Sequence, residues 1–188
     1  MSWFKTGKKE NTSMGELSDS IISYSFLCAE QLQDYFDELP EEEREQRRVY
    51  VSLEFTYFWM HVANMTAYNE IGNENRIKLQ GELGPLVIRP IVETLFSDLT
   101  EKMREPVVVE IFEKLNEAAL EYANCKNLPP EGDLYEDETI FSKLATNVAQ
   151  VFDQTQNSEL LKTILNLTLI TFNQIGMKNL INAASMEL

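Results

Sequence analysis

The sequence predicts an all-α fold, a single-domain bundle of about five to seven helices. Its composition, 44% apolar and 25% charged residues, is that of a folded globular protein. Apolar residues recur every three or four positions over long stretches, which is the period of an amphipathic helix. Only seven glycines and six prolines are present, too few turn signals for a fold of many short strands.

The first helix is expected from Ser13 to Leu39, after a flexible N-terminal tail (residues 1–12). Ser13 with Glu16 three positions later forms a capping-box pattern, which is typical of a helix start. The following apolar residues fall on one stripe and predict one buried face: they are Leu17, Ile21, Tyr24, Cys28, Leu32, Tyr35 and Leu39.

A long second helix is expected from Pro40 to Ile71. Proline suits a first helical turn, and Gly72 is a typical residue just after a helix end. From Val49 to Met65 the segment is apolar on nearly every side, so this helix should lie at the centre of the bundle.

Prolines interrupt the next segment, residues 73–105, where Pro85 and Pro90 predict short or kinked helices. Pro106 is expected to open another helix that ends near Asn127. An acidic segment rich in proline and glycine, residues 128–138, then predicts a loop.

Two further helices complete the expected domain (residues 13–188). One covers residues 141–152, and the last runs from about Ser158 to Ala184. The last helix has no charged residue from Thr163 to Met177, and we expect it to be buried, either in the core or against a second copy in a homodimer. The candidate interface residues on it are Leu161, Leu165, Leu169 and Phe172.

Polar and aromatic side chains form a second pattern along the long helix. Spacings of three and four place six of them on one stripe: Tyr50, Glu54, Tyr57, His61, Asn64 and Tyr68. The stripe could bind a small ligand or cofactor, with His61 as acid, base or ligand, or it could be a buried polar network. The residues alone do not separate these interpretations.

Charge restricts the partners. The chain carries 31 acidic and 16 basic residues, a formal net charge of −15, which disfavours nucleic acid because phosphate binding depends on lysine and arginine. Glu113, Glu117 and Glu121 repeat at intervals of four, and this acidic row would suit a basic protein partner.

The function expected from these patterns is protein–protein interaction without catalysis, with self-association. None of the common catalytic signatures is present, so no catalytic residue, metal ligand or cofactor is assigned, and an enzyme is less expected than a binding protein. Two alternatives stay open: a small-ligand or cofactor-binding protein, including an enzyme, that uses the stripe, and an acidic antagonist of an immunity type that masks a basic partner. We expect a cytoplasmic protein without stable membrane insertion.

Overall fold

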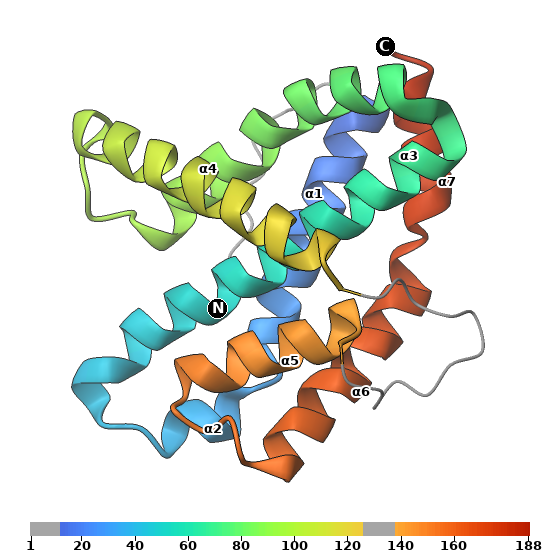
Figure 1. Ribbon diagram of the computed structural model, residues 1–188. Helices are drawn as coiled ribbons and strands as arrows, with labels where there is room; N and C mark the ends of the chain where they lie inside the picture. The colour runs from blue at the N-terminus through green and yellow to red at the C-terminus, as the bar shows by residue number, and fades with distance from the viewer. Residues whose placement is uncertain (1–11, 126–137) are drawn as a thin grey trace.

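The computed structural model describes residues 12–125 and 138–188, and helices dominate both ranges (Figure 1). Within these residues no extended strand is formed, so the predicted all-α bundle is confirmed. The helices are α1 (Ser13–Glu30), α2 (Gln33–Asp37), α3 (Glu41–Leu95), α4 (Glu101–Ala123), α5 (Ile140–Val151), α6 (Ser158–Ile175) and α7 (Met177–Ser185). The predicted tail, apart from Thr12, and the predicted acidic loop, apart from Glu138, lie outside the described residues.

The long helix α3 is the centre of the bundle and packs against α1, α4, α5 and α7. It consists of two halves, residues 41–71 and 73–95, because Gly72 has non-helical dihedral angles (φ 75°, ψ 171°). Figure 1 shows the chain reversing direction at this point. Of the segment predicted to be buried, Val49 to Met65, every residue from Val51 to Ala63 except Glu54 is buried. At its ends Val49, Asn64 and Met65 are half-buried and Tyr50 is exposed.

The second half of α3 corrects the prediction for residues 73–105, because it is one helix that runs through both prolines. Pro85 and Pro90 lie on its less buried side, while its inner face buries Leu83, Val87, Ile88 and Ile91. This packing outweighs the local preference of proline. Its inner face also touches α4 closely at Gly84, where a Cβ atom would lie 3.1 Å from the Phe112 ring.

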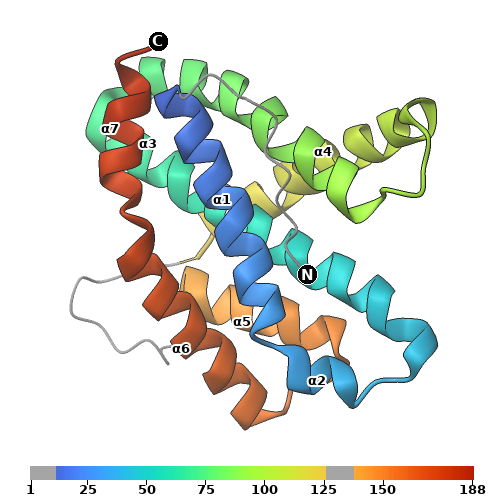
Figure 2. The ribbon, with the colours of Figure 1, turned by 180° about the vertical axis from the view of Figure 1, so that it is seen from behind.

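Helix α4 begins at Glu101, five residues before the predicted start at Pro106. It returns antiparallel to the second half of α3. In both views these two elements extend beyond the rest of the bundle (Figures 1 and 2). The pair is therefore covered by protein on fewer sides than the first half of α3.

The single N-terminal helix expected from Ser13 to Leu39 is two helices, α1 and α2. Leu32 leaves helical geometry (φ −96°, ψ 19°), and the turn brings Phe36 against Phe152, with ring centroids 4.9 Å apart. The N-cap of α1 is Thr12 instead of Ser13, since its side chain accepts a hydrogen bond from the Gly15 amide.

The single C-terminal helix expected from Ser158 to Ala184 is also two helices. Gly176 takes the left-handed conformation (φ 62°, ψ 34°) between α6 and α7. The break lets α7 pack on α1 and α3 while α6 packs on α5 and α1, an arrangement visible in Figure 2. A glycine at a helix end is the expected residue for this conformation.

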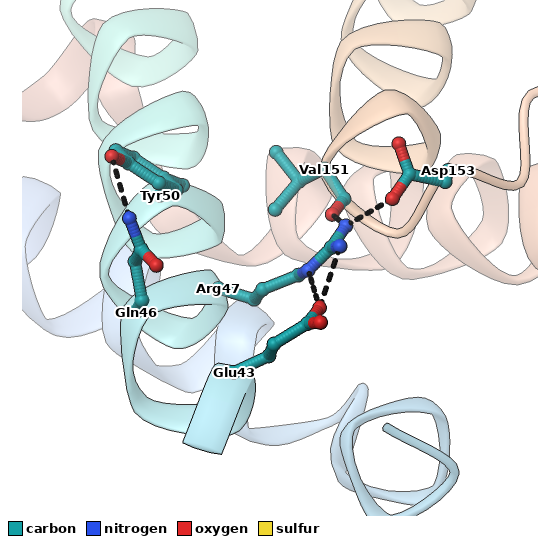
Figure 3. A network of polar contacts seen from close by, with 6 residues as sticks. All are labelled: Glu43, Gln46, Arg47, Tyr50, Val151 and Asp153. Atoms are coloured by element: carbon teal, nitrogen blue, oxygen red, sulfur yellow. Dashed lines mark hydrogen bonds and ion pairs between the residues drawn. The ribbon is translucent and has the colours of Figure 1, made fainter. Parts of the chain in front are cut away.

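A network of polar contacts centred on Arg47 joins the start of α3 to the end of α5 (Figure 3). The Arg47 guanidinium donates hydrogen bonds to Glu43 (2.7 and 3.0 Å) and to the backbone carbonyl of Val151, and it lies 2.7 Å from the Asp153 carboxylate. Gln46, one residue earlier, donates to the Tyr50 hydroxyl (3.2 Å). The Arg47 contacts tie the first turns of α3 to the end of α5, and the Asp153 side chain remains exposed to solvent.

Candidate functional site

The six residues of the predicted stripe do not share one environment. Tyr50 and Tyr68, at its two ends, are 49% and 59% exposed, whereas Tyr57 and His61 in the middle are buried. Glu54 and Asn64 are half-buried. The stripe therefore enters the core from one surface and leaves it at another, and only its middle is enclosed.

Glu54 contacts α5 through Asn147, whose side-chain amide donates a hydrogen bond to the carboxylate (3.2 Å). Burial raises the pKa of Glu54, and the Asn147 hydrogen bond opposes that rise only in part. An ion pair between Lys143 and Glu121 (3.0 Å) lies close enough to influence the carboxylate. The carboxylate of Glu54 is therefore half-buried and held by one side chain of α5.

His61 lies against the Tyr122 ring of α4, with centroids 5.3 Å apart. Neither imidazole nitrogen has a hydrogen-bond partner in the part of the chain that the structure describes. Burial lowers the pKa of His61 to about 4, so the ring is neutral at pH 7. The Tyr122 hydroxyl is likewise buried, without a hydrogen bond of normal geometry, and burial raises its pKa well above the ordinary value.

The other two polar groups of the stripe face different neighbours. Burial raises the pKa of Tyr57, and the carboxylates of Glu54, Glu110 and Glu117 add to the rise. The Asn64 side chain accepts a hydrogen bond from Arg76 (2.8 Å), which spans the two halves of α3 across the Gly72 turn. Asn64 is therefore a structural contact of the hairpin.

Two open surface hollows, of about 640 and 270 Å³, are lined by residues outside the stripe. Among the described residues no group of three or more histidine, cysteine, aspartate or glutamate side chains is gathered so that it could hold a metal ion. Glu54 thus has a hydrogen-bond partner on α5, whereas His61 is enclosed with neither nitrogen bonded to a described residue.

The candidate interface residues on α6 face inward more than outward. Leu165 is buried, Leu161 and Leu169 are half-buried, and Phe172 packs its ring against Phe141 at a centroid distance of 5.6 Å. The apolar side chain that α6 presents to water is Ile170, which is 54% exposed. Contacts within the chain thus cover most of the surface that we considered for a homodimer.

The candidate acidic residues lie on the outward side of α4. Glu113, Glu117 and Glu121 are all exposed. Glu117 pairs with Lys114 (2.7 Å) and Glu121 with Lys143, whereas Glu113 has no ion pair with any described residue. The row therefore lies on the exposed side of α4.

Sequence reasoning missed the apolar residues on the same side of α4. Met103 and Val109 are each 56% exposed, and Leu120 is 71% exposed. Their spacing along α4 could have identified them, because they fall outside the inner stripe of Val108, Ile111 and Tyr122. We name the outward side of α4 the α4 face; it is formed by Met103, Val109, Glu110, Glu113, Asn116, Glu117 and Leu120.

Comparisons with protein-family models, curated proteins and solved structures gave no match. No helix in the described ranges is both long and apolar enough to cross a bilayer.

Proposed function

We propose that this protein acts without catalysis, by binding another protein through the α4 face. The observation that carries the proposal is the exposure of three large apolar side chains, Met103, Val109 and Leu120, among glutamates on one helix. Single exposed apolar residues are normal on a surface, and these three are separated along α4, but all of them lie on one side of the same helix with glutamates between and beside them.

The position of α4 supports the proposal. The helix packs on α3 along one side, and it belongs to the part of the molecule that extends beyond the bundle in Figure 1. A partner could contact this side without displacing any helix. The net charge of −15 would speed association with a basic protein and would disfavour acidic ones.

The interpretation as an acidic antagonist is included in this proposal, because masking a basic surface is one way to use the α4 face. Self-association and a cytoplasmic location remain predictions. Binding of a small ligand along the stripe also remains a prediction, and native mass spectrometry of the freshly purified protein would test it.

The proposal is tested by partner capture with matched variants. The double variant Glu110→Lys/Glu113→Lys changes the α4 face, and Glu30→Lys/Glu38→Lys makes the same change in net charge at exposed positions on α1 and at the end of α2. We expect a partner that is retained by the native protein and by the second variant but lost by the first. The partner is then purified, and its affinity is measured at two salt concentrations.

The expected affinity falls as salt rises from about 50 to 500 mM, because screening weakens the attraction between exposed charges. If every captured protein is lost equally by both double variants, general charge and not the α4 face governs binding, and the proposal is wrong. If light scattering shows only the 21.7 kDa monomer and capture recovers nothing, the proposal is equally wrong.

A further inference from the structure

The α4 face has a regular geometry that restricts what can bind it. Val109, Glu113, Asn116 and Leu120 follow each other at intervals of four, three and four, so they form one line along the helix. The line from Val109 to Leu120 is about 16 Å long at the rise of an α-helix. It offers an apolar side chain near each end, with polar side chains between them.

The backbone of α4 limits the form of the partner. Its amide and carbonyl groups are used within the helix, and the described residues contain no strand with a free edge. An extended peptide laid on this face would bury its own amides without partners, which is unfavourable. A helical peptide satisfies its backbone internally and exposes only side chains.

The charges beside the line restrict the partner further. Glu113 lies within the line and Glu110 and Glu117 lie on one flank of it, and Glu110 and Glu113 form no ion pair with any described residue. Burying them against an apolar or acidic surface would be unfavourable, whereas lysine or arginine would pair with them. The partner should therefore carry basic side chains beside its apolar ones.

We propose that the α4 face binds a basic amphipathic α-helix that packs apolar side chains on Val109 and Leu120 and places lysine or arginine beside Glu110 and Glu113. This inference rests on the proposed function, because it names the partner of the same surface. Three helical turns, about 11 residues, cover the line.

The experiment uses the full chain and a designed probe peptide of about 16 residues, with leucines at helical spacing and lysines on one flank. Its control has the same composition in scrambled order. Fluorescence anisotropy measures binding to the native protein, to Leu120→Ser and to Ile170→Ser, a matched change at an exposed position on α6. All three proteins should fold, since both sites are exposed.

We expect the designed peptide to bind at least about tenfold more tightly than the scrambled one, and Leu120→Ser to remove most of that difference. Ile170→Ser should bind like the native protein. The Glu110→Lys/Glu113→Lys variant should lose binding and most of the salt dependence.

Three results would overturn the inference. The scrambled peptide could bind equally well, Leu120→Ser could bind the designed peptide normally, or the native protein could form a dimer that Leu120→Ser abolishes, so that a second copy occupies the face. If a captured partner depends on the α4 face but the designed peptide does not compete with it, the proposed function stands and only the helical partner is wrong.

Discussion

Two segments of this chain look alike in sequence and differ in the fold. The segments Val51–Ala63 and Thr163–Met177 both lack lysine and arginine and are rich in large apolar residues. In the first, Glu54 is the single residue that is not buried, whereas the second buries one side and exposes Asn166, Ile170, Asn173 and Gln174. Absence of charge therefore indicates burial poorly, and the uncharged amides mark the side of α6 that faces water.

The largest expected effect is on the free energy of unfolding, when a phenylalanine in each segment is replaced by alanine. Phe58 is fully buried and its ring contacts Trp59, Tyr122 and Phe141, while Phe172 is half-buried and contacts Phe141. Phe58→Ala should lower the free energy of unfolding by about 3–5 kcal/mol, and Phe172→Ala by about half as much, because less apolar surface leaves water. Urea unfolding followed by circular dichroism measures both. Equal losses would contradict the difference in burial.

The next largest effect is the pH dependence of stability that His61 produces in the buried segment. The pKa of His61 is lowered to about 4, below the ordinary 6.5, so above pH 6.5 its titration has no influence on stability. Between pH 6.5 and pH 4 the imidazole takes up its proton in the unfolded chain but not yet in the folded one. The free energy of unfolding therefore falls by about 3 kcal/mol over this range.

The measurement is the free energy of unfolding of the native protein and of His61→Phe at pH 7 and pH 4. The difference in the free energy of unfolding between the two proteins should grow by about 3 kcal/mol from pH 7 to pH 4. At pH 7 the variant should be at least as stable as the native protein, because two unpartnered nitrogens are removed. A constant difference across this range would show that His61 is accessible to protons in the folded state.

Two glycines with positive φ, Gly72 between the two halves of α3 and Gly176 at the end of α6, lie near or after the C-terminal ends of these segments and should respond differently to asparagine. Gly176 is left-handed, a conformation that asparagine tolerates, so Gly176→Asn should cost about 1 kcal/mol. Gly72 has φ 75° and ψ 171°, a region that glycine alone occupies readily, so Gly72→Asn should cost about 2–3 kcal/mol. A Cβ atom added at either glycine would meet no atom within 4 Å beyond the adjoining residues, so the difference comes from the backbone. Thermal unfolding of the two variants measures the losses, and a larger loss of stability in Gly176→Asn than in Gly72→Asn would contradict this account.

The smallest expected effect concerns the water-facing side of α6. Ile170→Ser should change the free energy of unfolding by less than about 0.5 kcal/mol, because the side chain is 54% exposed. Sedimentation of the same variant tests the predicted self-association. A dimer that is lost on this substitution would show that α6 forms an interface, which would reduce the contrast between the two segments.

Sequence patterns were most informative where local and tertiary effects agree. The start of α3 and the break at Gly72 follow from proline and glycine preferences, and most of the burial predicted for Val49 to Met65 follows from composition. The helix through Pro85 and Pro90 could not be predicted, because contacts with α4 outweigh the local preference. The break at Leu32 also depends on a distant contact, between Phe36 and Phe152.

In the candidate site, too, contacts between different helices could not be predicted from the pattern of one helix. Helical spacing placed Glu54 and His61 on one stripe, but spacing alone cannot reveal Asn147 or Tyr122, which come from other helices. Nor can it show that the ends of the stripe are exposed while its middle is buried. The exposure of Leu120 could have been predicted, because its position away from the buried stripe of α4 depends on the spacing within that one helix.

A contact between the two ends of the described chain has a practical consequence. The Glu187 carboxylate accepts hydrogen bonds from the backbone amides of Ser13 (2.6 Å) and Met14 (3.2 Å), and these bonds lower its pKa. Glu187 thus supplies a cap for the first turn of α1. Removing this residue or fusing a bulky tag beside it would disturb a helix that begins 174 positions earlier in the chain, so reporter labels are better attached at an internal surface position such as Glu30.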